Sequence, residues 1–271
     1  MTSILFASDL DRTLIYSARA FWLETRDEDA PAIAVAEIYQ GAPLSYLTRA
    51  SETLLLGLRA RATFVPVTTR TVAQYRRVRL PGGTPEWAVT TNGGVLLHHG
   101  EPDEAWSASV RRRTAERSAP LPEVLALLSA PALAAWILRT HDAEGLFLYA
   151  IVSRDDVVDA ELTELTTACA DRGWTVSLQG RKLYCVPRTI DKASAVDEVR
   201  RRVGASAVVA AGDSLLDRSM LEQATVALRP AHGELHDVAF EASNLTVTVS
   251  RGILAGEELL GLAAAAVERL G

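Results

Sequence analysis

An apolar run that leads directly into two acidic residues is the feature that most constrains this chain of 271 residues. Ile4 to Ala7 has the length and composition of a buried β-strand. Asp9 and Asp11 follow at or just past its carboxyl end, where ligands bind in open α/β sheets. Two carboxylates this close repel each other unless a cation lies between them, and an oxygen-liganded ion such as Mg²⁺ suits them best. By itself the pair favours a simpler interpretation, a strand that ends in an acidic turn.

The order of the predicted elements indicates an α/β fold. Helix and strand patterns alternate between residues 49 and 90 and again between 191 and 270, and this alternation predicts a parallel sheet. Closer to the start, Leu14 to Arg26 is amphipathic enough to predict a helix. Residues 33–39 and 44–47 predict the two strands of a hairpin around Gln40-Gly41-Ala42-Pro43.

The pattern changes between these two α/β stretches. Polar helices and separate strands replace the alternation from about residue 101 to residue 180. We therefore predict a core of residues 1–95 and 181–271, interrupted by an inserted α+β domain of residues 96–180.

Composition excludes several classes of protein. The net charge of −6 argues against a nucleic-acid binder that works through bulk electrostatics. No apolar run reaches the roughly 18 residues of a membrane span, and the N-terminal stretch meets Asp9 too early for a signal peptide. Cys169 and Cys185 are the only cysteines, which we interpret as reduced. We expect a cytoplasmic protein that binds neither nucleic acid nor membranes.

The basic and imidazole side chains give two further indications. Lys182 and Lys192 are the only lysines, so a position that keeps lysine indicates a need for an ammonium group. The histidines show no spacing typical of a metal site, since His98 and His99 are adjacent. His232 and His236 are four residues apart but have no plausible third ligand beside them. We therefore predict no zinc centre.

Four features combine the residue types that phosphoryl transfer requires. They are the pair Asp9 and Asp11, Thr68 at the end of an apolar strand, Lys192 at a helix start, and Gly212-Asp213-Ser214 with Asp217. Strand ends and helix starts meet at one edge of a parallel sheet, and Asp213 and Asp217 share a helix face. Together with Mg²⁺, the four features would neutralise the charge on a phosphoryl group and supply a carboxylate nucleophile. Each feature alone is also compatible with a structural role, such as a helix start at Gly-Asp-Ser.

Taken together, these motifs resemble the haloacid dehalogenase (HAD) superfamily of phosphatases over the whole chain. The matching segments are DLDRT at 9–13, Thr68, Lys192 and GDSLLD at 212–217. The resemblance implies a Rossmann-like core in which Asp9 is the nucleophile and a Mg²⁺ ligand. It further implies that Asp11 is the general acid/base, with its backbone carbonyl on the metal. The remaining implied roles are phosphoryl binding by Thr68 and Lys192, metal binding by Asp213, and support by Asp217 and Ser214.

The inserted block is similar to the α+β cap of the subfamily that dephosphorylates sugar phosphates and similar metabolites. Thr68-Thr69-Arg70 is similar to its threonine-glycine-arginine signature, and Asn92-Gly93-Gly94 to its turn before the cap. Arg70 and Asn92 are thus candidate substrate contacts. The sequence departs from the pattern at Arg12 and Thr69, where glycine is usual, and at Leu216, where asparagine is common.

The predicted function is Mg²⁺-dependent hydrolysis of a small phosphorylated metabolite, with a sugar phosphate favoured, through an aspartyl-phosphate on Asp9. A phosphomutase, which returns the phosphoryl group to its substrate, is one alternative. A regulatory binding protein that has lost turnover is the other.

Overall fold

The computed structural model describes residues 3–271 and shows two compact units. The first contains the residues up to Asp103 together with Lys192–Gly271, and the second contains Glu104–Asp191. The insertion thus begins at 104 rather than 96 and ends at 191 rather than 180. Strand pairing explains both differences, because β7 (Glu101–Pro102) pairs with β6 of the first unit and β11 (Lys182–Pro187) lies between β10 and β9 of the second.

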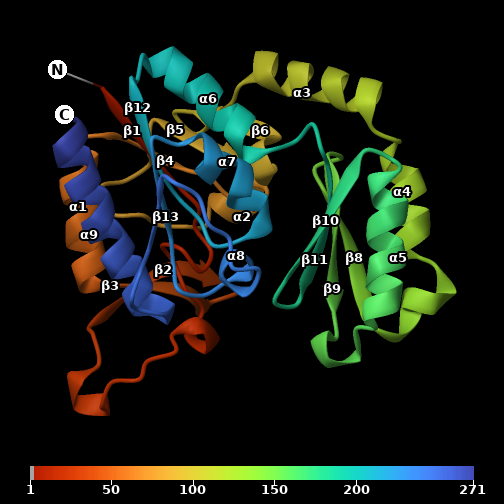
Figure 1. Cartoon of the computed structure of the whole chain (residues 1–271), viewed down its shortest axis with the longest axis horizontal. Coiled ribbons are helices and arrows are strands. Elements are labelled where there is room, and N and C mark those ends of the chain that lie inside the picture. Colours follow the sequence, from red (N-terminus) through yellow and green to blue (C-terminus); the bar gives the residue numbers. More distant parts are fainter. Residues whose placement is uncertain (1–2) are drawn as a thin grey trace. The chain divides into compact units, whose positions relative to one another are not determined.

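A five-stranded parallel sheet forms the centre of the first unit (Figure 1). Its order is β14-β13-β12-β1-β4, and its central strands are buried apolar runs. Ser8 at the end of β1 lies opposite Ala211 on one side and Pro66 on the other. The bounds are Ile4–Ser8 (β1), Thr63–Pro66 (β4), Ala207–Ala211 (β12), Val226–Arg229 (β13) and Leu245–Val247 (β14).

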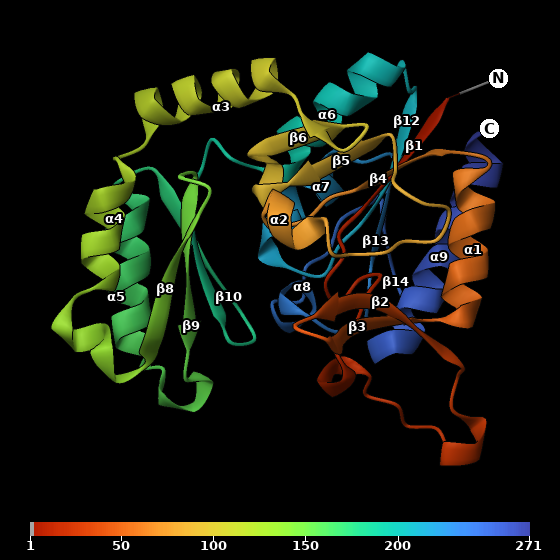
Figure 2. The same cartoon turned by 180° about the vertical axis from the view of Figure 1, so that it is seen from behind.

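Helices cover both faces of this sheet. The long helices α1 and α9 pack together on one face, and α6 and α7 lie on the other, as Figures 1 and 2 show from opposite sides. Helix α1 begins where the Thr48 side chain accepts a hydrogen bond from the backbone N–H of Ser51. The bounds are Arg49–Arg59 (α1), Val72–Tyr75 (α2), Lys192–Val203 (α6), Arg218–Gln223 (α7), Glu234–Asp237 (α8) and Gly252–Leu270 (α9).

Two small antiparallel sheets complete the first unit. The predicted hairpin is confirmed as β2 (Ile33–Tyr39) and β3 (Ala42–Thr48). The other sheet contains β5 (Trp87–Thr90), β6 (Val95–His98) and β7.

The helix predicted from Leu14 to Arg26 is wrong. Only a 3₁₀ turn forms there, at Ala18–Ala20. Tyr16 instead exchanges two backbone hydrogen bonds of 2.8 Å with Tyr46 of β3. Pairing with a distant strand therefore prevails over the local helical pattern.

The second unit is an antiparallel sheet covered by helices, and this confirms the predicted α+β insertion. Its strand order is β10-β11-β9-β8, and α4 and α5 pack on one face (Figures 1 and 2). The bounds are Glu104–Arg117 (α3), Leu121–Leu128 (α4), Ile137–Ala143 (β8), Phe147–Val152 (β9), Asp159–Ala170 (α5) and Trp174–Gln179 (β10). Among residues 3–271, no helix has the length and apolarity that crossing a membrane requires.

Candidate active site

The structure brings the predicted acidic residues together beyond the carboxyl ends of β1 and β12. Asp9 follows β1, and its backbone N–H donates to the carbonyl of Ala211, the last residue of β12, at 2.9 Å. Asp213 follows β12 two residues later. One carboxylate oxygen from each of Asp9, Asp213 and Asp217 lies within 4.8 Å of the others. All three residues are buried.

Lys192 joins two of these carboxylates. It is the first residue of α6, and its side chain is fully buried. Its Nζ donates to Oδ1 of Asp9 at 2.6 Å and to Oδ1 of Asp217 at 2.5 Å. Burial disfavours the charged ammonium, but the carboxylates of Asp217 and Asp9 outweigh that effect and raise the pKa of Lys192.

Asp217 supports the loop as well as Lys192. Its Oδ2 accepts from the backbone N–H groups of Asp213 (3.1 Å) and Ser214 (2.9 Å) and from the Ser214 hydroxyl (2.7 Å). A Cβ at Gly212 would lie 2.5 Å from the Asp217 carboxyl carbon, so only glycine allows this close approach. Both Asp217 oxygens are thus engaged by protein donors, which leaves Asp9 and Asp213 as the more available carboxylates.

With its three carboxylates ionised, this cluster carries more negative than positive charge. Three carboxylates and one ammonium leave two uncompensated negative charges. Burial raises the pKa of Asp9, and burial together with Asp9 and Asp217 raises the pKa of Asp213 well above its usual range. A divalent ion with a preference for oxygen ligands fits this centre in both charge and donor type.

A second charged network extends from Asp11. Arg70 binds both Asp11 oxygens and donates from Nη1 to Oε2 of Glu37 at 2.7 Å. Glu37, on β2, also accepts from Nε of Arg77 (2.9 Å) and from the Ser45 hydroxyl (3.1 Å). The Glu37 side chain is fully buried, whereas 47% of the Asp11 side chain is exposed. Asp11 is therefore fixed in orientation yet reachable.

The sequence analysis did not identify Glu37. Its position depends on irregular pairing of β2 with β3 on both sides of Glu37, which places two successive residues, Ala36 and Glu37, in buried positions. A lone carboxylate within the apolar run Ile33–Tyr39 was the only available signal.

The structure connects Thr68 and Arg70, in the segment that follows β4, with Asn92, in the turn that follows β5. The Thr68 backbone N–H donates to the Val89 carbonyl at 2.8 Å, and the Thr68 carbonyl accepts from the Asn92 backbone N–H at 2.9 Å. Its hydroxyl accepts from the Arg70 N–H at 3.2 Å. Substrate contacts by Arg70 and Asn92 stay predictions.

The departure at Arg12 places an arginine at a position whose backbone is left-handed. Arg12 has a φ of 63°, a left-handed conformation that favours glycine. The backbone N–H of Gly252 donates to Nδ1 of His232 at 3.2 Å, so Nε2 carries the proton and donates to the Arg12 carbonyl at 2.9 Å. Burial lowers the pKa of His232 to about 4, consistent with this neutral form. His232 thus helps to fix the Asp9–Thr13 loop, a contact that the sequence did not indicate.

Comparison with known proteins gives results for structure only. No protein-family model matches the sequence, and a search of curated proteins found no match. Among solved structures, the chain is similar to the sucrose-phosphatase from Synechocystis, with a TM-score of 0.68 and 15% identity over 97% of this chain and 98% of that one. It is also similar to a subclass IIB sugar phosphatase of the HAD superfamily (TM-score 0.58, 13% identity, 98% and 100% covered). A third similar structure is the C-terminal domain of the C. albicans trehalose-6-phosphate phosphatase, with a TM-score of 0.56 and 12% identity over 98% of this chain and 93% of that one.

This chain has the HAD phosphatase fold. The predicted resemblance is thereby confirmed at the level of architecture, as is the Rossmann-like parallel core with an inserted α+β domain. Both the core and the insertion are included, because the matches cover nearly all of this chain and of its HAD-fold neighbours.

Proposed function

We propose that this protein is a HAD-superfamily phosphatase that hydrolyses small phosphorylated metabolites, with Asp9 as the nucleophile. The observation that carries the proposal is the Lys192 ammonium, which binds Asp9 and Asp217 at once within a buried acidic cluster. A fully buried lysine with two carboxylates is costly to maintain for stability alone. In a phosphatase it is positioned to bind the oxygens of a phosphoryl group on Asp9.

The first step transfers the phosphoryl group to the protein. A carboxylate oxygen of Asp9 attacks phosphorus while the bond from phosphorus to the leaving oxygen breaks. Asp11 gives its proton to that oxygen, so the product leaves as a neutral alcohol. Lys192 and the Thr68 hydroxyl hold the transferring oxygens. Asp9, Asp213 and the Asp11 backbone carbonyl would hold Mg²⁺, which when bound neutralises charge on the phosphoryl oxygens.

The second step restores Asp9. A water molecule attacks phosphorus, the bond to the Asp9 oxygen breaks, and Asp11 accepts the water proton. Arg70 keeps the Asp11 carboxylate oriented between the two steps, and the exposure of Asp11 allows it to exchange protons with solvent. Inorganic phosphate is the product.

A sugar phosphate is the favoured substrate class. The support is the similarity in fold to a sucrose-phosphatase and to a trehalose-6-phosphate phosphatase domain. We propose that the α+β insertion selects the substrate, and that Arg70 and Asn92 contribute contacts from the core.

The test is release of inorganic phosphate from a panel of sugar phosphates, with Mg²⁺ and with EDTA, by the wild type and Asp9→Asn. Release that requires both Mg²⁺ and Asp9 would support the proposal. Interconversion of isomeric sugar phosphates without phosphate release would replace it with a phosphomutase. Metal-dependent binding of beryllium fluoride without turnover of any substrate would favour a regulatory binding protein.

A further inference from the structure

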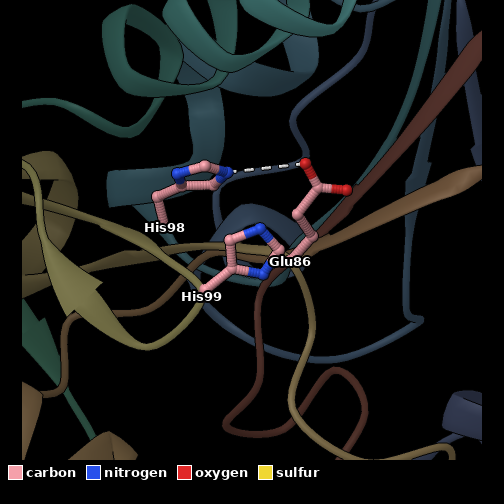
Figure 3. A group of neighbouring side chains, drawn as sticks. All are labelled: Glu86, His98 and His99. Carbon is pink, nitrogen blue, oxygen red and sulfur yellow. Dashed lines mark ion pairs between the residues drawn. The ribbon is translucent and has the colours of Figure 1, made fainter.

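A second group of potential metal ligands lies at the surface of the first unit. Glu86 immediately precedes β5, His98 is the last residue of β6, and His99 follows it. Figure 3 shows the three side chains gathered together, with the His98 ring facing the Glu86 carboxylate. One ligand atom from each lies within 4.8 Å of the others, and Nε2 of His98 is 3.5 Å from Oε1 of Glu86. We propose that Glu86, His98 and His99 form a surface binding site for a divalent transition-metal ion of the zinc type.

The backbone explains how adjacent histidines reach one ion. Successive side chains of a regular strand point to opposite faces. His99 has a φ of 52° and Gly100 a φ of 84°, so the extended conformation ends at His98. The two imidazole rings consequently lie with centroids 4.2 Å apart. The left-handed turn thus brings together two histidines whose spacing in the sequence did not indicate a metal site.

Fixed contacts hold the three residues in place. The His99 backbone N–H donates to the Glu86 carbonyl at 2.7 Å, which ties the start of β5 to the end of β6. Trp87 and His98 are cross-strand partners, and their rings stack with centroids 4.1 Å apart and planes inclined by 19°. A ligand set whose backbone and one ring are already ordered loses less entropy on binding.

The donor atoms distinguish this group from the acidic centre. Two imidazole nitrogens and one carboxylate oxygen favour ions such as Zn²⁺, Ni²⁺ or Cu²⁺, whereas Mg²⁺ prefers oxygen alone. The His98 and Glu86 side chains are 45% and 55% exposed, so water can complete the coordination. The two centres should therefore bind different ions independently.

The experiment is a calorimetric titration of the 271-residue chain with Zn²⁺ in buffer that contains excess Mg²⁺. Co²⁺ absorption in the visible range gives a second readout of nitrogen ligation. His98→Phe keeps a ring to stack on Trp87, and His99→Asn keeps a residue that tolerates positive φ. Each should weaken Zn²⁺ binding at least about tenfold, the smallest loss typical of a disturbed metal site. Glu86→Gln is the third variant, and it tests the site if either histidine variant does not fold.

Two controls make the outcome decisive. His141→Phe removes a histidine that stacks on Tyr149 of β9 and should leave Zn²⁺ binding unchanged. Asp9→Asn should also leave it unchanged. Equal Zn²⁺ affinity in the wild type and all three ligand variants would overturn the proposal, and so would a loss of binding confined to Asp9→Asn.

Discussion

Arg70 holds both carboxylate oxygens of Asp11, donating from Nε to Oδ2 at 2.7 Å and from Nη2 to Oδ1 at 2.8 Å. This parallel pair of hydrogen bonds fixes the plane of the Asp11 carboxylate as well as its position. Glu37 in turn holds Arg70, so a residue of the β2–β3 hairpin controls the orientation of the proposed acid/base.

Glu37→Gln should weaken this network while preserving its shape. Loss of the buried charge weakens the hydrogen bonds that residue 37 accepts, and hydrogen bonds to a charged group each contribute about 1.5–3 kcal/mol. We expect a comparable decrease in the free energy of unfolding. A less restrained Arg70 should also shift the pH dependence of kcat. Urea denaturation and pH–rate profiles measure these effects. The matched control is Glu52→Gln, which breaks a surface pair with Arg49 and should change neither quantity appreciably. Unchanged stability and an unchanged pH profile in Glu37→Gln would contradict the assigned role.

Lys192→Met should be strongly destabilising at neutral pH. It leaves the buried carboxylates of Asp9 and Asp217 without their ammonium partner, and breaking a buried pair in this way costs about 3–5 kcal/mol. The loss should be smaller at pH 5 than at pH 8, because protonation of the carboxylates removes the uncompensated charge. Denaturation in EDTA at the two pH values tests this expectation. Lys182→Met, which changes the only other lysine, should have little effect, and a similar loss in both variants would contradict the prediction.

Asp213→Asn should stabilise the metal-free protein and abolish stabilisation by Mg²⁺. Removing one buried negative charge relieves repulsion with Asp9 and Asp217, and we expect a gain of about 1 kcal/mol in EDTA. In the wild type, Mg²⁺ at 100 times its Kd should add about 2.7 kcal/mol. Thermal denaturation with and without Mg²⁺ distinguishes the two effects. The surface variant Asp197→Asn should behave as the wild type, and Mg²⁺ stabilisation that survives in Asp213→Asn would exclude Asp213 as a ligand.

His232 should make stability fall as the solution is acidified. Its pKa is about 4 in the folded chain and about 6.5 when unfolded, so the unfolded chain binds the extra proton first. This contribution is fully present above pH 6.5 and is lost as the pH falls toward 4, with a total of roughly 3 kcal/mol. Free energies of unfolding measured across this range should decline less steeply for His232→Gln than for the wild type. Parallel curves would contradict the prediction.

The acidic centre was predictable from the sequence because its signals are local. Asp9 and Asp213 each follow a short apolar strand, and parallel strands align their carboxyl ends. The strand and helix order of the core follows from the same periodicities. Scarcity of lysine and a position at a helix start together indicated Lys192, one of only two ammonium groups among many guanidinium groups.

The remaining features depend on contacts between distant segments. Strand irregularity turns Glu37 inward, Tyr46 prevents a helix at Tyr16, and pairing of β11 with β10 and β9 moves the domain boundary to 191. The left-handed turn at His99 brings two adjacent imidazoles together. Sequence alone determined which residues lie at the strand ends, because local periodicity predicts where each strand ends. Only the tertiary structure decided which other side chains contact those strand-end residues. The reason is that bulges, isolated bridges and positive φ angles arise from packing between distant segments, which no local sequence pattern predicts.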